Sequence, residues 1–247
     1  MLAAGCGKGT AYQQQTTPPP PPPPPSVQTT PPPQTTTLSL YFLRDGKIAA
    51  ARRGVPATQR VGEAAVRALL EGPSQEESSA GLRTAIPAGT AYRSLSIENK
   101  VAKVDLGSGL SRAAEAQVVY TLTQFPTVRS VRVGAGQFTR ADLEDLTPLI
   151  FVESPVVGET VTSPLRIHGT ANTFEATFQV ELRAGGRRII KGTVTATSGS
   201  GTRGTFDISI PFKVRRGMDG VLIVYELSAA NGRPVHIVRL PVRIEPS

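Results

Sequence analysis

The residue types that carry most enzyme chemistry are scarce in this chain of 247 residues. It contains two histidines, His168 and His236, and a single cysteine, Cys6. Each histidine lies in a strand-like run beside β-branched residues, without the neighbouring ligands that a metal pair or triad needs. No phosphate-binding glycine loop follows a predicted strand in the first domain. We therefore predict no catalytic residue, no bound metal and no cofactor, and we interpret both histidines as ordinary strand positions.

Three carboxylates are the remaining candidates for chemistry or recognition. Asp105 ends a predicted strand and Glu98 begins a predicted turn. A wall hydrolase would need two such groups about 5 to 9.5 Å apart in a concave site. Glu175 lies between Phe174 and Phe178, where a carboxylate pairs with a cation, faces a partner or is a solvated or backbone-bonded strand residue. The sequence leaves these alternatives open.

Cys6 has a different setting. The segment Leu2-Ala3-Ala4-Gly5-Cys6 resembles a bacterial lipobox, in which small residues precede a cysteine that is lipidated and becomes the mature N-terminus. Ala3 stands where such motifs usually have leucine, and the residues before Cys6 are fewer than the roughly 15 to 30 of a secretory signal. Either translation starts upstream and Cys6 carries lipid, or Cys6 is a free thiol.

The segment that follows Cys6 has the composition of a tether. Residues 7–37 are rich in Gly, Gln, Thr and Pro and contain one charged residue, Lys8. Such a segment cannot bury enough apolar surface to fold. Its eight prolines at 18–25 favour the extended polyproline conformation, which spans roughly 25 Å at about 3.1 Å per residue. We therefore predict that residues 1–37 form a lipobox-like N-terminus and a disordered proline-rich linker.

The chain has a net charge of +8. A basic surface favours anionic lipid headgroups, anionic wall polymers or nucleic acid. Nucleic-acid binding would be better supported by aromatic side chains on the basic face, but only 5% of the residues are aromatic and none is tryptophan. We expect no nucleic-acid partner. No window after residue 10 offers the roughly 18 consecutive apolar residues of a membrane-spanning helix, so any membrane attachment is expected at the N-terminus.

Residues 38–138 combine strand and helix patterns and predict a mixed domain. Alternation over residues 38–43 predicts a strand with one strongly apolar face, and a turn at Asp45-Gly46 leads into a second strand. Apolar residues at spacings of three and four predict two helices, one that starts at Thr58 and one that ends at Pro126. Further short strands are expected on both sides of residues 98–100 and after Pro126.

Residues 149–247 lack helical periodicity and predict an antiparallel sandwich of about seven strands. The acidic segment 139–148 is expected to connect this domain to the first. The predicted strands cover residues 150–152, 165–169, 176–183, 188–196, 205–211, 220–228 and 235–244.

Both domains contain sequence motifs that are specific enough to indicate a family. The first contains RALLEGP, IPAGT, VAKVDL and QVVYTLTQFPTVRSV in this order, and it resembles the GerMN domain, a sporulation and germination module of bacterial envelope proteins. The second begins with FVESPVVGETVTSPLRIHGT and continues with GTFDISIPF, and it resembles the Gmad2 domain of spore germination proteins. The resemblance implies a multidomain fold class: an α/β (α+β) GerMN domain with two helices on a small sheet, then an all-β immunoglobulin-like sandwich.

Together these observations predict a non-catalytic, extracytoplasmic lipoprotein of the bacterial envelope, with a role in envelope assembly, sporulation or germination. Cys6 would carry the lipid anchor, and the two domains would bind envelope proteins or a cell-wall polymer. The GerMN resemblance also implies self-association into a homo-oligomer. The alternatives are a cell-wall hydrolase or its carbohydrate-binding accessory, and a cytoplasmic module for which Met1 is the true start.

Overall fold

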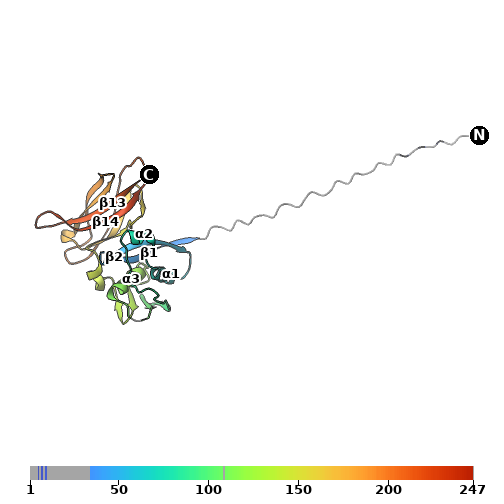
Figure 1. The fold of residues 1–247 in the computed structure, drawn as a ribbon, viewed down its shortest axis with the longest axis horizontal. Helices are drawn as coiled ribbons and strands as arrows, with labels where there is room; N and C mark the ends of the chain where they lie inside the picture. The colour runs from blue at the N-terminus through green and yellow to red at the C-terminus, as the bar shows by residue number, and fades with distance from the viewer. Residues whose placement is uncertain (1–4, 6, 8, 10–33, 108, 247) are drawn as a thin grey trace, which may run out of the picture. The chain divides into compact units, whose positions relative to one another are not determined.

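The computed structural model describes residues 34–107 and 109–246, together with glycines 5, 7 and 9. The lipidation site predicted at Cys6 and most of the predicted tether lie outside the described residues. From residue 34 onward the chain forms two domains, each with its own hydrophobic core (Figure 1). None of the described helices is both long and apolar enough to cross a bilayer.

The first domain combines a two-stranded hairpin, three helices and a four-stranded sheet. The hairpin pairs β1 with β2, and the sheet has the order β3-β4-β5-β6, in which β4 and β5 are parallel. The elements are β1 (Thr35–Arg44), β2 (Lys47–Pro56), α1 (Val61–Leu70), α2 (Gln75–Ser79), β3 (Ser94–Glu98), β4 (Val101–Asp105), α3 (Arg112–Leu122), β5 (Ser130–Val133) and β6 (Gly136–Phe138).

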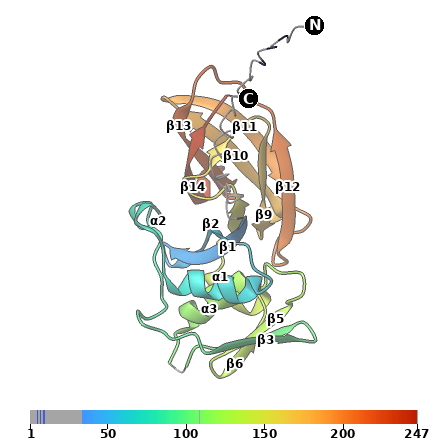
Figure 2. The ribbon, with the colours of Figure 1, turned by 90° about the vertical axis from the view of Figure 1, so that its right-hand side faces the viewer.

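The β1–β2 hairpin is buried on both faces, although its sequence predicted one apolar face. Figure 2 shows it between the helices α1 and α3 and the second domain. Leu40 and Phe42 are fully buried in the core of the first domain. Tyr41, which points to the opposite face, is also buried and packs against Phe151 of the second domain. The prediction was therefore incomplete, because a second domain covers the other face.

Helix α3 closes the free edge of β1 with polar side chains. The N–H of Tyr41 donates to Oγ1 of Thr121, and its carbonyl accepts from Nε2 of Gln117, both at 3.2 Å. Gln124 bonds both backbone groups of Ser39, at 2.9 and 2.6 Å. Gln117 and Thr121 are fully buried, and burial of such groups is tolerated because they are hydrogen-bonded. These side chains therefore take the place of a third strand.

Two elements of the first domain begin at positions that differ from the prediction, and α3 also ends at Leu122 rather than at Pro126. Strand β1 begins at Thr35, before the predicted domain start at Leu38, because β2 extends to Pro56 and offers partners to the β-branched threonines 35–37. Helix α1 begins at Val61 rather than Thr58, because Oγ1 of Thr58 accepts a hydrogen bond from the N–H two residues later and forms a turn there. Both differences lie at element ends, where sequence patterns are weakest.

The acidic segment between the domains has internal structure. It contains the 3₁₀ helix η1 (Ala141–Leu146), whose Leu143 is fully buried. Asp142 accepts hydrogen bonds from the N–H and the hydroxyl of Thr139, both at 2.7 Å, and these bonds lower the pKa of its carboxyl. Asp145 accepts from the guanidinium of Arg112 at 2.8 and 3.3 Å. Two of the three acidic residues therefore fix the segment to the first domain or to itself.

The second domain is a sandwich of a five-stranded sheet, β11-β10-β13-β14-β8, and a three-stranded sheet, β12-β9-β7. All seven predicted strands are present, and the short β8 is added to them. The strands are β7 (Ile150–Ser154), β8 (Thr160–Val161), β9 (Leu165–Ala171), β10 (Thr177–Ala184), β11 (Arg187–Thr195), β12 (Gly204–Ile210), β13 (Met218–Leu227) and β14 (Pro234–Ile244). The two sheets meet through Phe178 and Phe206, whose ring centroids are 4.9 Å apart.

Gly169 provides a test of this packing. It lies in β9, between β12 and β7, and a Cβ at this position would collide with the carbonyl oxygen of Phe151 and meet the Phe206 ring. We expect G169A to lower the free energy of unfolding by about 2 kcal/mol or more, because the backbone carbonyl cannot move away without breaking the sheet. Urea unfolding of the full-length protein measures this change.

The matched control is G192A. Gly192 lies in β11, where an added Cβ meets nothing, so the same substitution should change stability by no more than about 0.5 kcal/mol. Equal effects of the two substitutions would contradict the packing described for β9.

Candidate functional site

The structure does not bring the two histidines together. His168 lies in β9 of the three-stranded sheet, and His236 lies in β14 of the other sheet. His236 is not an ordinary strand position as predicted: its φ is +52°, at a bulge in β14, and its Nε2 is 3.8 Å from a carboxylate oxygen of Glu226. Within residues 34–107 and 109–246, no group of three or more His, Cys, Asp or Glu side chains could hold a metal ion.

Asp105 and Glu98 do not converge. They lie at opposite ends of the β3–β4 pair, four strand positions apart, which corresponds to roughly 13 Å. Each carboxylate instead faces a cation of its own: Asp105 is 3.8 Å from Arg93, and Glu98 is 3.1 Å from Lys103. The spacing that a hydrolase would require of this pair is absent.

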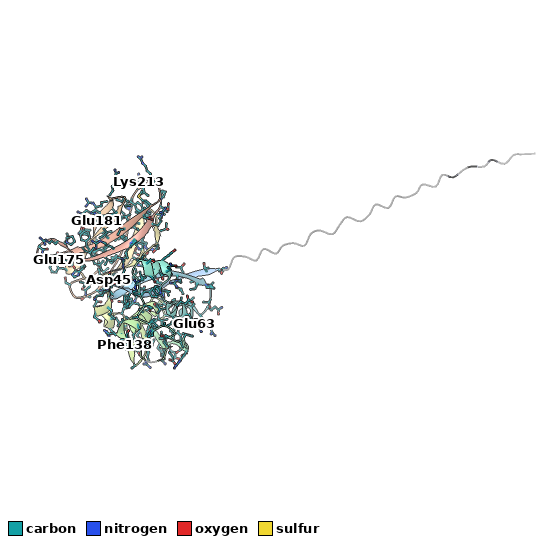
Figure 3. All side chains as sticks on the ribbon, viewed as in Figure 1. Asp45, Glu63, Phe138, Glu175, Glu181 and Lys213 are labelled. Carbon is teal, nitrogen blue, oxygen red and sulfur yellow. The ribbon has the colours of Figure 1, made fainter. Side chains whose placement is uncertain are left out.

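Glu175 lies outside the strands, in the short 3₁₀ helix η2 (Phe174–Ala176), and is exposed. Its N–H donates to Oγ of Ser200 at 3.1 Å, and its φ is +52°. Phe178 is buried in the core, whereas Phe174 is more than half exposed. Figure 3 shows Glu175 at one end of the second domain. Of the alternatives that the sequence left open, the structure favours a solvated carboxylate.

A cluster of hydrogen-bonded polar side chains lies where the two domains meet. Arg140, just after β6, donates from Nη1 to Oε1 of Glu153 in β7 at 2.8 Å, and from Nε to Oγ1 of Thr123 at 2.8 Å. The hydroxyl of Tyr41 donates to the same Glu153 oxygen at 2.6 Å. We call Arg140, Tyr41, Glu153 and Tyr120 the domain joint, since they come from both domains.

Aromatic rings enclose the guanidinium of the joint. Cζ of Arg140 lies 4.6 Å from the ring centroid of Tyr120 and 5.2 Å from that of Tyr41, within the range of cation–π attraction. The same two rings contact Phe151 of the second domain, at centroid distances of 6.1 Å from Tyr41 and 5.7 Å from Tyr120. The joint therefore combines an ion pair with an apolar cluster.

Burial and the contacts within the joint together determine the protonation states of Tyr41 and Arg140. Burial and the Glu153 carboxylate raise the pKa of the Tyr41 hydroxyl far above its usual range, so Tyr41 remains a neutral donor. Burial alone would lower the pKa of Arg140, but Tyr41 and Glu153 more than offset this effect and raise it. Arg140 therefore stays charged inside the interface, where a missing partner would be costly.

A second ion pair fastens the acidic segment to the second domain. The guanidinium of Arg203 donates to both carboxylate oxygens of Glu144, at 2.7 and 2.8 Å, and to the carbonyl of Pro148 at 2.9 Å. Nδ2 of Asn172 also donates to Glu144, at 3.1 Å. Burial would raise the pKa of Glu144, but the hydrogen bonds from Arg203 and Asn172 outweigh it and hold the pKa below its ordinary value.

A cavity of about 550 Å³ lies beside the joint. Its lining includes Ile48 and Ala50 of β2, Val152 of β7 and Leu240 of β14. Asp45, at the tip of the β1–β2 hairpin, also lines it and lies between the two domains in Figure 3. Volumes of about 300 to 1,000 Å³ are typical of ligand pockets, so this cavity is large enough to hold a ligand.

Comparison with known families assigns both domains. Residues 39–136 match the Germane family, described as sporulation and spore germination. Residues 149–233 match the Gmad2 family, described as an immunoglobulin-like domain of bacterial spore germination. The chain joins a GerMN domain to a Gmad2 domain. The predicted families and fold class are thereby confirmed.

Two solved structures are similar to parts of the chain. The tandem GerMN domains of the sporulation protein GerM from Bacillus subtilis are 23% identical, with a TM-score of 0.37, over 40% of this chain and 38% of that one. A candidate lipoprotein from Clostridium perfringens is 22% identical, with a TM-score of 0.31, over 46% of this chain and 93% of that one. The chain thus spans less than half of the GerM chain. No curated protein matches it.

The sequence did not reveal the residues that join the GerMN and Gmad2 domains. Arg140 directly follows the last strand of the GerMN domain, and Glu153 lies near the end of the first Gmad2 strand. A cation and a carboxylate at the strand ends on either side of a connecting segment can indicate an ion pair between two domains. This indication is weak, because most such residues are solvated, and the partners Tyr41 and Tyr120 lie far away in the sequence.

We expect R140M to uncouple the two domains. The substitution keeps an apolar stem of similar length but leaves Glu153 without its cation, at a place where the Glu153 side chain is only 16% exposed. The free energy of unfolding should fall by roughly 2 kcal/mol or more, and urea unfolding should separate into two transitions, one for each domain. Far-ultraviolet circular dichroism of the full-length protein measures both effects.

R166M serves as the control. Arg166 and Asp207 pair at 2.6 Å, but their side chains are 67% and 52% exposed, so its loss should cost less than about 1 kcal/mol. A single transition for R140M, with a cost no larger than that of R166M, would contradict the role of the joint.

Glu144 should contribute to acid sensitivity. Its folded-state pKa is lowered, so its contribution is complete above the unfolded pKa of about 4.3 and is lost as the pH falls through the folded value. We expect E144Q to be less stable than the native chain by about 1 kcal/mol at pH 7, and the difference to shrink below about pH 4. Thermal unfolding from pH 7 to pH 3 measures it, with the exposed Glu76 as the E76Q control; a difference independent of pH would contradict the ion pair.

Proposed function

We propose that this protein is a non-catalytic lipoprotein of the bacterial envelope, which presents its GerMN and Gmad2 domains as one interaction unit outside the membrane. The families of both domains are described by sporulation and spore germination rather than by a reaction. The two domains are joined by a short connecting segment, and both family descriptions include spore germination. Germination is therefore the process that we propose.

The domain joint is the observation that carries this proposal. An enzyme with two domains usually needs a cleft in which reactive groups converge, whereas the polar groups of the joint bind one another and hold the domains together. Arg140, Glu153 and Tyr41 satisfy one another at 2.6 to 3.3 Å. Such an arrangement supports a rigid binding surface that extends over both domains.

The anchor completes the proposal. Cys6 would carry the acyl chains, and residues 7–34 would act as a spacer between the membrane and the GerMN domain, which begins with β1 at Thr35. Two or more chains on one cysteine give stable anchoring, where a single chain is marginal. The partners would be envelope proteins, an anionic wall polymer that the net charge of +8 attracts, or a second copy through the GerMN domain.

Fatty-acid labelling tests the anchor. The gene is expressed in its native bacterium with its own upstream sequence, and cells are fed an alkyne fatty acid. Because the chain has one cysteine, we expect label in the native protein and none in C6S, together with accumulation of an unprocessed precursor when globomycin blocks the lipoprotein signal peptidase.

The matched control moves the thiol. The double variant C6S/S26C keeps one cysteine but places it outside the lipobox, so it should stay unlabelled and accumulate as the unprocessed precursor. Label in this variant, or processing of C6S to the size of the native mature protein, would contradict lipidation at Cys6.

A further inference from the structure

The cavity between the domains borders an unpaired strand edge. Strand β14 pairs with β13 on one side along its length, but on the other side β8 reaches only Arg243 and Ile244. The last backbone bond on that side is the one from the Gly158 N–H to the Pro241 carbonyl, at 2.8 Å. Residues 236–240 of β14 continue past this point along the cavity. This segment has the form of an open sheet edge.

Backbone groups of β14 point to the open side. Alternate residues of a strand direct their backbone groups to the same side, and the N–H of Arg243 and the carbonyl of Pro241 point away from β13. Arg239 shares this alternation, which ends at the bulge around His236. The carbonyl of Arg239 accepts a hydrogen bond from Nη1 of Arg44 at 2.6 Å. A side chain from the hairpin tip thus occupies a position that the N–H of an added strand would take.

The cavity lining carries more cations than carboxylates, and the charge of Lys47 also acts on Glu144 and Asp145 of the acidic segment. Arg44, Lys47 and Arg239 line it, and within the described part of the chain none of them forms an ion pair with a carboxylate. Lys47 donates to the carbonyl of Asp145 instead. Asp45 is the one acidic residue of the lining. An occupant with carboxylates would meet an excess of cations.

A second groove lacks this excess of cations without an ion-pair partner. It lies on the GerMN domain, has a volume of about 800 Å³ and contains Arg60, Arg67 and Arg93. Glu63, also in that groove, lies 3.6 Å from Arg60 and 2.8 Å from Arg67, and Arg93 is 3.8 Å from Asp105. Its cations already have partners, so charge favours the cavity between the domains.

We propose that this cavity binds an extended peptide segment that carries acidic residues between apolar ones, and that the segment adds as a strand to the open edge of β14. Backbone pairing would supply affinity, while the apolar lining and Lys47 and Arg239 would select the side chains. Residues 1–33 contain no Asp or Glu, so they do not fit this description, and we assign the segment to another protein. This inference rests on the proposed function as an interaction protein and adds the chemistry of its partner.

Affinity selection tests the proposal. The full-length C6S protein is incubated with a pool of short peptides that alternate glutamate with Val, Ile, Leu, Phe or Tyr, and bound peptides are identified by mass spectrometry. Retained peptides are then measured by fluorescence anisotropy. We expect binding of acidic peptides, a loss of at least about tenfold when lysine replaces glutamate, and a similar loss when their backbone amides are methylated, because strand addition needs those N–H groups.

Charge reversal locates the site. In the C6S protein, K47E/R239E should weaken binding by about tenfold or more, whereas R187E/K213E, with the same change in net charge, should leave it unchanged. Lys213 lies at the far end of the second domain from Asp45 (Figure 3). Equal losses in both double variants, tolerance of amide methylation, or no retained acidic peptide would overturn the proposal.

Sedimentation of the protein without peptide tests the alternative that a second copy of the chain occupies the cavity. A concentration-dependent dimer that K47E/R239E dissociates would show that a second copy fills the cavity, and would also overturn the proposal. Because acyl labelling of Cys6 is measured independently, a failure of peptide binding is distinguishable from a failure of the lipoprotein function.

Discussion

The arrangement of the two domains depends on one buried positive charge. The guanidinium of Arg140 lies between the rings of Tyr41 and Tyr120 and is neutralised by a single carboxylate, that of Glu153. Because an unpaired charge at this depth would be expensive, each partner must stay where it is. Tyr41 belongs to the first strand of the GerMN domain and Glu153 to the first strand of the Gmad2 domain, so the charge fixes the beginning of each domain against the other.

This constraint explains the burial of the β1–β2 hairpin on both faces. A two-stranded sheet is marginal by itself, and here one face packs on helices while the other packs on β7 of the Gmad2 domain. The connection between the domains contributes in the same way, since Asp145 binds Arg112 on one side and Glu144 binds Arg203 on the other. Hydrogen bonds and ion pairs at the interface thus hold the two domains, each with its own apolar core, together as one compact unit.

Much of this fold could be predicted from local patterns. The alternation of apolar and polar residues in the second domain predicted all seven main strands, and the family motifs predicted the order of the two domains. Both predictions succeeded because each pattern lies within contiguous residues. The joint could not be predicted in this way. Tyr41 lies off the apolar face of the predicted strand, and the helical periodicity says nothing about Gln117 and Thr121. All three are buried because the element that covers each of them lies far away in the sequence. A strand position was one alternative for Glu175, but β10 begins two residues later, and the positive φ values of Glu175 and Ala176 leave no periodic signal in the sequence.

The closure of β1 by the amides and hydroxyl of α3 has a consequence for how copies of this protein meet. A bare strand edge is a template on which an identical chain can stack, and soluble proteins avoid such edges by covering or distorting them. Since Ser39 and Tyr41 have their backbone groups satisfied within the same molecule, β1 offers no template at these positions. Neighbouring molecules, however closely packed, are thereby prevented from fusing into a continuous cross-β array at this edge.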